Sequence, residues 1–152
     1  MIVADTNGKA ATVKFTLDGK DVEALPGETI WQVAKRQGIE IPHLCYSPEP
    51  SYRADGNCRA CMVEIEGERV LAASCIRKPS EGMKVKATSD RAKTARQMVF
   101  ELLVTDQPER ATSHDPQSKF WSWADRMGID VGRFPEREKM PTPDRSHPAM
   151  AV

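Results

Sequence analysis

Four cysteines constrain this chain more than any other feature of its 152 residues. They are Cys45, Cys58, Cys61 and Cys75, spaced C-x12-C-x2-C-x13-C, and no other cysteine is present. Two neighbouring and two separated cysteines meet only if the backbone folds back on itself. Four converging thiolates are the ligands that a 2Fe–2S cluster takes. We therefore predict that these four residues bind one 2Fe–2S cluster.

Other uses of four cysteines stay open at this point. Structural zinc usually takes two close pairs, and here only Cys58 and Cys61 form such a pair. Disulfides suit an even count but belong to oxidising compartments, and the segment MIVADTNGKAATV lacks the pattern of a secretory signal. We accordingly expect a cytoplasmic protein. Inert buried thiols fit poorly with the polar, turn-forming residues that precede Cys61.

The residues between the cysteines suit a loop that wraps around charge. Glycine lets a backbone approach closely and take positive φ, so Gly56 and Asn57 are expected to point N–H groups at the sulfurs, where hydrogen bonds tune a cluster. Two interpretations of Arg59 stay open: its side chain offsets the negative charge of the cluster, or it is exposed to solvent, as most arginines are. For His43 we expect packing or hydrogen bonding, because four cysteines leave no iron ligand missing.

The first 88 residues read as an α+β domain. Val13, Phe15 and Leu17 alternate with polar residues, which predicts a half-buried strand, and Asp18-Gly19 predicts a hairpin into KDVEAL. A helix is expected over residues 29–37, capped by Thr29 and stopped by Gly38.

A second hairpin is expected in MVEIEGERVLAA, turning at Gly67. Val63 and Ile65 would lie opposite Val70, with Cys75 after the returning strand. A short strand over residues 83–86 completes the predicted sheet.

The chain becomes helical after Ser89, a candidate N-cap, and Pro108 should end this run. Its expected apolar stripe is Ala92, Ala95, Val99, Leu102 and Leu103. A second helix is expected over residues 117–127, with Pro116 in its first turn and Gly128 at its end. Its aromatic face is expected to pack on the domain of residues 1–88 or to dock onto another domain or subunit. The predicted organisation is a cluster domain (1–88), a helical segment (89–128) and an extended tail (129–152).

Charge and motifs limit the function. The 22 basic and 22 acidic side chains cancel, so neither nucleic acid nor an anionic membrane is an expected partner, and no apolar run is long enough to span a bilayer. The sequence has no GxGxxG or GxxxxGK[ST] phosphate loop and no nucleophile constellation. We expect no catalysis by this chain alone.

The phrases IPHLCY, GNCRACMVEIEG and LAASC carry a resemblance. They resemble the N-terminal 2Fe–2S domain of the large iron–sulfur subunit of NADH:quinone oxidoreductase (complex I), and the diaphorase small subunit of NAD-reducing hydrogenases. They look still more like the α subunit of NAD-dependent molybdenum or tungsten formate dehydrogenases. This resemblance implies a β-grasp ferredoxin-like fold with Cys45, Cys58, Cys61 and Cys75 as cluster ligands.

The resemblance also implies a function and partners. The chain would be an electron-transfer module of an NAD-linked formate dehydrogenase, working with four-iron cluster, metal–pterin and flavin/NAD modules, either as the first part of a larger subunit or separately encoded. Complex I relatives bind a further cluster through a histidine and three cysteines after the long helix, where this chain offers only His114. The alternatives are the equivalent module of a hydrogenase or complex I-type enzyme, and a zinc-stabilised interaction domain.

Overall fold

The computed structural model describes residues 12–130 and 133–135. The chain forms two compact units, Met1–Val99 and Phe100–Val152. Residues 1–11 and most of the expected tail at residues 129–152 lie outside the described part. Within that part, no helix has the length and apolar character needed to cross a membrane.

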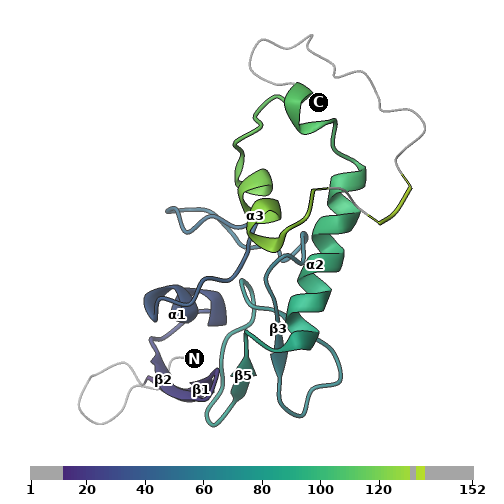
Figure 1. Cartoon of the computed structure of the whole chain (residues 1–152). Coiled ribbons are helices and arrows are strands. Elements are labelled where there is room, and N and C mark those ends of the chain that lie inside the picture. Colours follow the sequence, from purple (N-terminus) through teal and green to yellow (C-terminus); the bar gives the residue numbers. More distant parts are fainter. Residues whose placement is uncertain (1–11, 131–132, 136–152) are drawn as a thin grey trace. The chain divides into compact units, whose positions relative to one another are not determined.

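The first unit contains a mixed five-stranded sheet in the order β2-β1-β5-β3-β4 (Figure 1). Its strands are β1 Val13–Leu17, β2 Lys20–Ala24, β3 Met62–Ile65, β4 Ala72–Ala73 and β5 Lys84–Lys86. β1 and β5 run parallel, and the other neighbours are antiparallel. With a helix between the first and second hairpins, this arrangement confirms the predicted α+β, β-grasp fold.

The first hairpin forms as its sequence predicts. Asp18 and Gly19 both take positive φ, 48° and 79°, which is the type I′ turn that matches the twist of paired strands. The alternation of β1 then buries Phe15 and Leu17, and Val22 of β2 joins them in the core.

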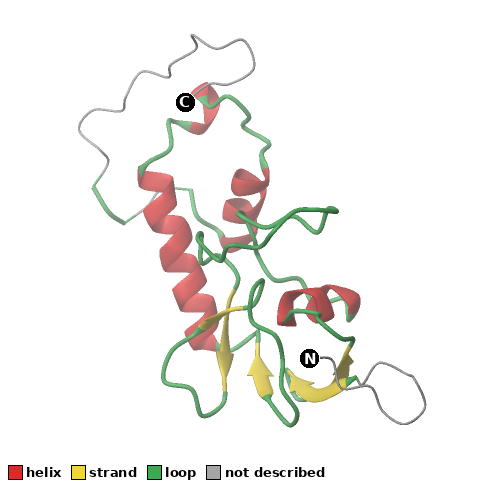
Figure 2. Cartoon of the chain, turned by 180° about the vertical axis from the view of Figure 1, so that it is seen from behind, coloured by secondary structure: helices red, strands yellow, loops and turns green. Residues whose placement is uncertain are grey.

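Helix α1, Ile30–Arg36, packs its apolar side on the sheet and supplies four core residues. Thr29 begins it with a capping box, because the Thr29 side chain accepts from the Gln32 backbone while the Gln32 side chain accepts from the Thr29 N–H. Gly38 follows its end at φ 74°. Figure 2 shows α1 over the strands and the long irregular loop that leads from it to β3.

The second hairpin differs from the prediction. Val63 pairs with Ala72, and Val70 is 60% exposed rather than paired. The chain does turn at Gly67, but the Arg69 carbonyl then accepts from the Arg91 side chain of α2 at 2.5 Å rather than from a neighbouring strand. The returning strand is therefore only two residues long, a tertiary effect that alternation along the chain does not encode.

Helix α2, Asp90–Thr105, begins as predicted with the Ser89 hydroxyl accepting from the Ala92 N–H at 3.2 Å. Its buried side was predicted in part. Ala92, Arg96 and Phe100 are buried at a four-residue spacing, whereas Leu102 is 48% exposed. The expected stripe was wrong at Leu102 because only apolar residues were counted, which left the buried Arg96 out.

The second unit contains a single 3-10 turn, Arg110–Thr112, and helix α3, Lys119–Met127, within its described residues. α3 starts two residues later than predicted, because Ser118 rather than Pro116 leads into its first turn. Gly128 ends the helix in the left-handed conformation, as expected. Phe120 stacks on Phe100 with ring centroids 5.7 Å apart. Packing of α3 on the cluster domain (residues 1–88) stays a prediction.

Leu17 tests the core of the sheet. Leu17→Ala should lower the free energy of unfolding by about 2–5 kcal/mol, because the fully buried side chain leaves a cavity. Leu25→Ala is the matched control, since Leu25 is 52% exposed and should cost about 0.5 kcal/mol or less. Urea unfolding followed by circular dichroism measures both, and equal losses would contradict the assigned core.

Candidate metal centre

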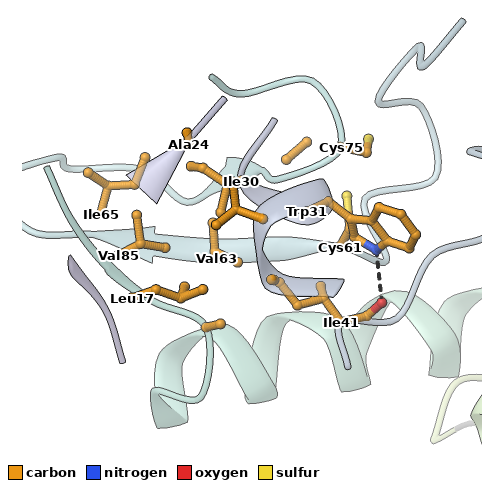
Figure 3. Packing of buried hydrophobic residues seen from close by; sticks show 14 of the residues in the cluster. Leu17, Ala24, Ile30, Trp31, Ile41, Cys61, Val63, Ile65, Cys75 and Val85 are labelled. Carbon is orange, nitrogen blue, oxygen red and sulfur yellow. Dashed lines mark hydrogen bonds between the residues drawn. The ribbon is translucent and has the colours of Figure 1, made fainter. Parts of the chain in front are cut away.

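The sheet itself places two of the four cysteines. Cys61 directly precedes β3, and Cys75 follows β4. The antiparallel register Met62↔Ala73 sets Cys61 opposite Ser74, so the sulfur-bearing residues lie diagonally across the ladder end. The Ser74 N–H and hydroxyl both donate to the Cys61 carbonyl, at 3.2 and 2.8 Å. Both cysteines are 1% exposed, and Figure 3 shows them at one end of the core.

The other two cysteines come from the irregular loop and face each other. The Cys45 N–H points at the Cys58 sulfur, and the Cys58 N–H points at the Cys45 sulfur, each at 3.5 Å. Both side chains are half-buried. The C-x2-C turn that follows Cys58 is closed by Arg59 at φ 58°, so the backbone can bring Cys61 to the start of β3.

The four thiols form one electrostatic group made of two pairs. A hydrogen bond from Cys75 lowers the pKa of Cys61 to about 6, and the same hydrogen bond raises the pKa of Cys75, because the pair shares one proton. The charges of Cys61, Cys45 and Cys58 raise the pKa of Cys75 further. Burial raises the pKa of the Cys58 thiol. The charge on Cys75 is thus coupled to its partner Cys61 and to both cysteines of the loop pair.

Backbone N–H groups act on the sulfurs, but they come from other residues than the expected Gly56 and Asn57. Those of Cys45, Ala60 and Leu44 act on the Cys58 sulfur and favour its charged form. Gly56 is buried and takes the expected positive φ, 67°; a contact of its N–H with a sulfur stays a prediction. Asn57 and Arg59 are exposed, so the solvated reading of the Arg59 side chain fits the structure better than a buried charge offset.

Helix α1 holds the Cys75 side of the site by its first turn. The first N–H groups of a helix have no partner within it. Here the Ile30 N–H donates to the Arg77 carbonyl at 2.9 Å, and the Trp31 N–H donates to the Ser74 carbonyl at 3.0 Å. The segment that carries Cys75 is thereby fixed to α1 as well as to β3.

Trp31 of the same helix holds the Cys45 side. Its indole N–H donates to the Ile41 carbonyl at 3.1 Å (Figure 3), and its ring meets His43 and Tyr46 edge-on at 4.5 and 5.1 Å. His43 Nδ1 lies 3.2 Å from the same carbonyl, which confirms the packing and hydrogen-bonding role expected for it. His114 lies exposed in the second unit.

Sequence reasoning did not identify Trp31, Tyr46 and Ser74 as residues of the site. Trp31 and Tyr46 had a usable signal, since an aromatic on a short helix and another beside Cys45 suggest a hydrophobic wall. Ser74 had none, because its role depends on the register of β3 and β4.

The donor set fits a two-iron cluster. Among residues 12–130 and 133–135, no three histidine, cysteine, aspartate or glutamate side chains are grouped in a way that could hold one metal ion. A 2Fe–2S cluster asks for two protein ligands on each of two irons. Two pairs of thiols, one in the loop and one at the sheet end, match that requirement.

Comparison with known sequences adds an independent finding. Residues 10–90 match a family described as "2Fe-2S iron-sulfur cluster binding domain". The mitochondrial NADH-ubiquinone oxidoreductase 78 kDa subunit of Candida albicans is 34% identical over 136 residues, 88% of this chain and 19% of the relative. NADP-reducing hydrogenase subunit HndD of Solidesulfovibrio fructosivorans is 37% identical over 120 residues, 76% of this chain and 20% of the relative.

A solved structure agrees over most of the chain. The crystal structure of an NAD+-reducing NiFe hydrogenase in the H2-reduced state contains a chain that superposes with a TM-score of 0.74 at 28% identity. The match covers 91% of this chain and 58% of that one. The chain spans about a fifth of the length of the curated relatives it matches.

Gly56 tests the cluster loop. Gly56→Ala should destabilise the folded loop by about 1–2 kcal/mol, because a residue with a Cβ disfavours the left-handed backbone conformation. The new Cβ would lie 2.8 Å from Ile76 Cδ1, but the exposed Ile76 side chain can rotate away, so backbone strain dominates. The variant should lose iron faster than wild type when challenged with a chelator.

Gly67→Ala is the matched control for this experiment. Gly67 has φ 84° and open space around it, so it carries similar strain far from the sulfurs. Its iron should be retained as in wild type. Equal retention in Gly56→Ala and wild type would show that the loop tolerates a side chain there.

Proposed function

This chain belongs to the family of 2Fe–2S iron–sulfur cluster binding domains, and on that premise we propose that it is the electron-transfer module of a larger NAD-linked oxidoreductase. The cofactor of this family is a 2Fe–2S cluster. We assign Cys45 and Cys58 to one iron and Cys61 and Cys75 to the other. Two observations carry the assignment. The N–H groups of Cys45 and Cys58 each contact the other residue's sulfur at 3.5 Å, and the β3–β4 register places Cys61 diagonally opposite Cys75.

When bound, the cluster supplies one-electron redox chemistry at a potential set by hydrogen bonds, charge and solvent exposure. The chain supplies the surroundings. Backbone N–H groups directed at the sulfurs stabilise negative charge. The Trp31, His43 and Tyr46 side chains pack beside the Cys45 segment and limit water there. The sheet and α1 fix the Cys75 segment, which keeps structural reorganisation small when charge changes.

We propose a formate dehydrogenase as the host complex. Its support is the resemblance of the cysteine-bearing phrases together with the region after α2, which offers His114 but none of the three further cysteines of complex I relatives. The partners would then be four-iron cluster, metal–pterin and flavin/NAD modules. A second candidate, an NAD-reducing hydrogenase, is favoured by the superposition at a TM-score of 0.74.

The ligand assignment predicts the effect of single substitutions. Cys58→Ser and Cys61→Ser should each abolish or severely weaken the cluster and lower solubility, because cluster binding helps to hold the loop folded. Iron and labile sulfide content, visible absorption and the electron-spin signal on reduction measure the loss.

His43→Gln is the control, since it keeps a hydrogen-bond donor without being a proposed ligand, and it should retain both irons. A colourless wild-type protein with one zinc per chain would support the interaction-domain alternative. A cysteine variant with full iron and an unchanged spectrum would remove that residue from the ligand set.

The host is tested by isolating the native complex through a tag on this chain. Formate-dependent reduction of NAD+ and a metal–pterin subunit identified by mass spectrometry are the expected results. Hydrogen-dependent reduction with a NiFe subunit would instead identify the hydrogenase. Purification from cells grown with and without formate is a useful control, since the proposed host should become more abundant with its substrate.

A further inference from the structure

Arg96 is the one buried basic residue in the described part of the chain, at 7% exposure. It projects from α2 in the first unit, between the buried Ala92 and Phe100 of the same helix face. A buried charge without compensation is costly. Its presence therefore calls for a specific reason.

The contacts of Arg96 place it beside the metal centre. Its Nε donates to the Met62 carbonyl at 2.8 Å, and its Nη2 donates to the Ala87 carbonyl. Met62 directly follows Cys61. The guanidinium thus holds the peptide that leaves the Cys61 ligand position and ties it to the end of β5 and to α2.

The charge of Arg96 is only partly balanced. No carboxylate of the described residues forms an ion pair with it, and the Met62 and Ala87 carbonyls that accept its hydrogen bonds are neutral. Burial lowers the pKa of Arg96, and the negative charges of Asp18 and Cys61 raise it. Asp18 Oδ1 accepts from the Thr88 N–H at 3.1 Å, while its buried Oδ2 has no hydrogen-bond partner in the described residues. The guanidinium stays protonated in any case.

We propose that Arg96 is a positioning residue that holds the Cys61 side of the cluster and raises its reduction potential through a fixed, buried positive charge, with Asp18 attenuating this effect. The inference rests on the proposed ligation by Cys61. Reduction adds one negative charge to the cluster, so a nearby cation favours the reduced state. Inside a protein that attraction is screened far less than at the surface.

The experiment is a potentiometric titration of the cluster, followed by electron-spin resonance, in the full chain. For Arg96→Gln, the ratio of reduced to oxidised cluster at a fixed potential should fall about tenfold, a shift of about 59 mV for one electron. Arg96→Lys keeps the charge and should shift the ratio by less than half as much on a logarithmic scale.

Two further variants separate charge from structure. Lys93→Gln removes a positive charge from an exposed position on the same helix, where water and salt screen it, and should leave the potential unchanged. Asp18→Asn removes the attenuating negative charge and should raise the ratio. Asparagine suits the left-handed turn position that Asp18 occupies, so this variant should fold.

The outcomes decide between an electrostatic and a structural role. An Arg96→Gln protein with full iron and an unchanged potential would overturn the proposal, and so would equal shifts in the Gln and Lys variants, which indicate a structural role. If Arg96→Gln holds no cluster, Asp18→Asn decides: a raised ratio supports the proposal and an unchanged one overturns it. Wild-type protein without iron and sulfide would instead reject the proposed function itself.

Discussion

Gathering negative charge inside a folded domain is the constraint on which this structure depends. Four sulfurs sense one another's charge, and a low-dielectric interior makes each uncompensated charge costly. The chain compensates with backbone N–H groups aimed at the sulfurs. It also buries the Arg96 guanidinium, which donates to the carbonyl of Met62, the residue after Cys61. The guanidinium is carried by helix α2, and the N–H donors lie in a loop that the Trp31 indole of α1 anchors at Ile41. This anchoring keeps their reorganisation small when an electron arrives.

Helix α1 connects the two halves of the site although it carries no cysteine. Its first N–H groups hold the segment around Cys75, and the Trp31 indole holds the segment that leads to Cys45. One seven-residue helix thus fixes segments that are thirty residues apart in the sequence. The core under α1 is therefore part of the electron-transfer site as well as of the fold.

The local sequence was a reliable guide wherever a short-range rule decided the outcome. The Asp18-Gly19 turn, the Thr29 cap and the alternation of β1 all formed as predicted, because each depends on neighbours within a few residues. The predictions for Val70 and Leu102 were wrong for the opposite reason. The loop that holds Val70 is contacted from elsewhere in the chain, by the Arg91 side chain on the Arg69 carbonyl. The buried face of α2 includes Arg96, a charged residue that an apolar pattern omits.

The sequence by itself pointed to the chemistry: four cysteines at this spacing predicted a 2Fe–2S cluster, and the match of residues 10–90 to a 2Fe–2S cluster binding family agrees with that prediction. Tertiary structure alone decided which cysteines lie together and which N–H groups face them. It also decided that Arg96 holds the carbonyl of Met62, next to Cys61. Candidate ligands can be recognised from residue type and spacing. The pairing of the cysteines and the charges near their sulfurs depend on distances in space. Those distances are set by the register of β3 with β4 and by the packing of α1, neither of which can be read along the chain.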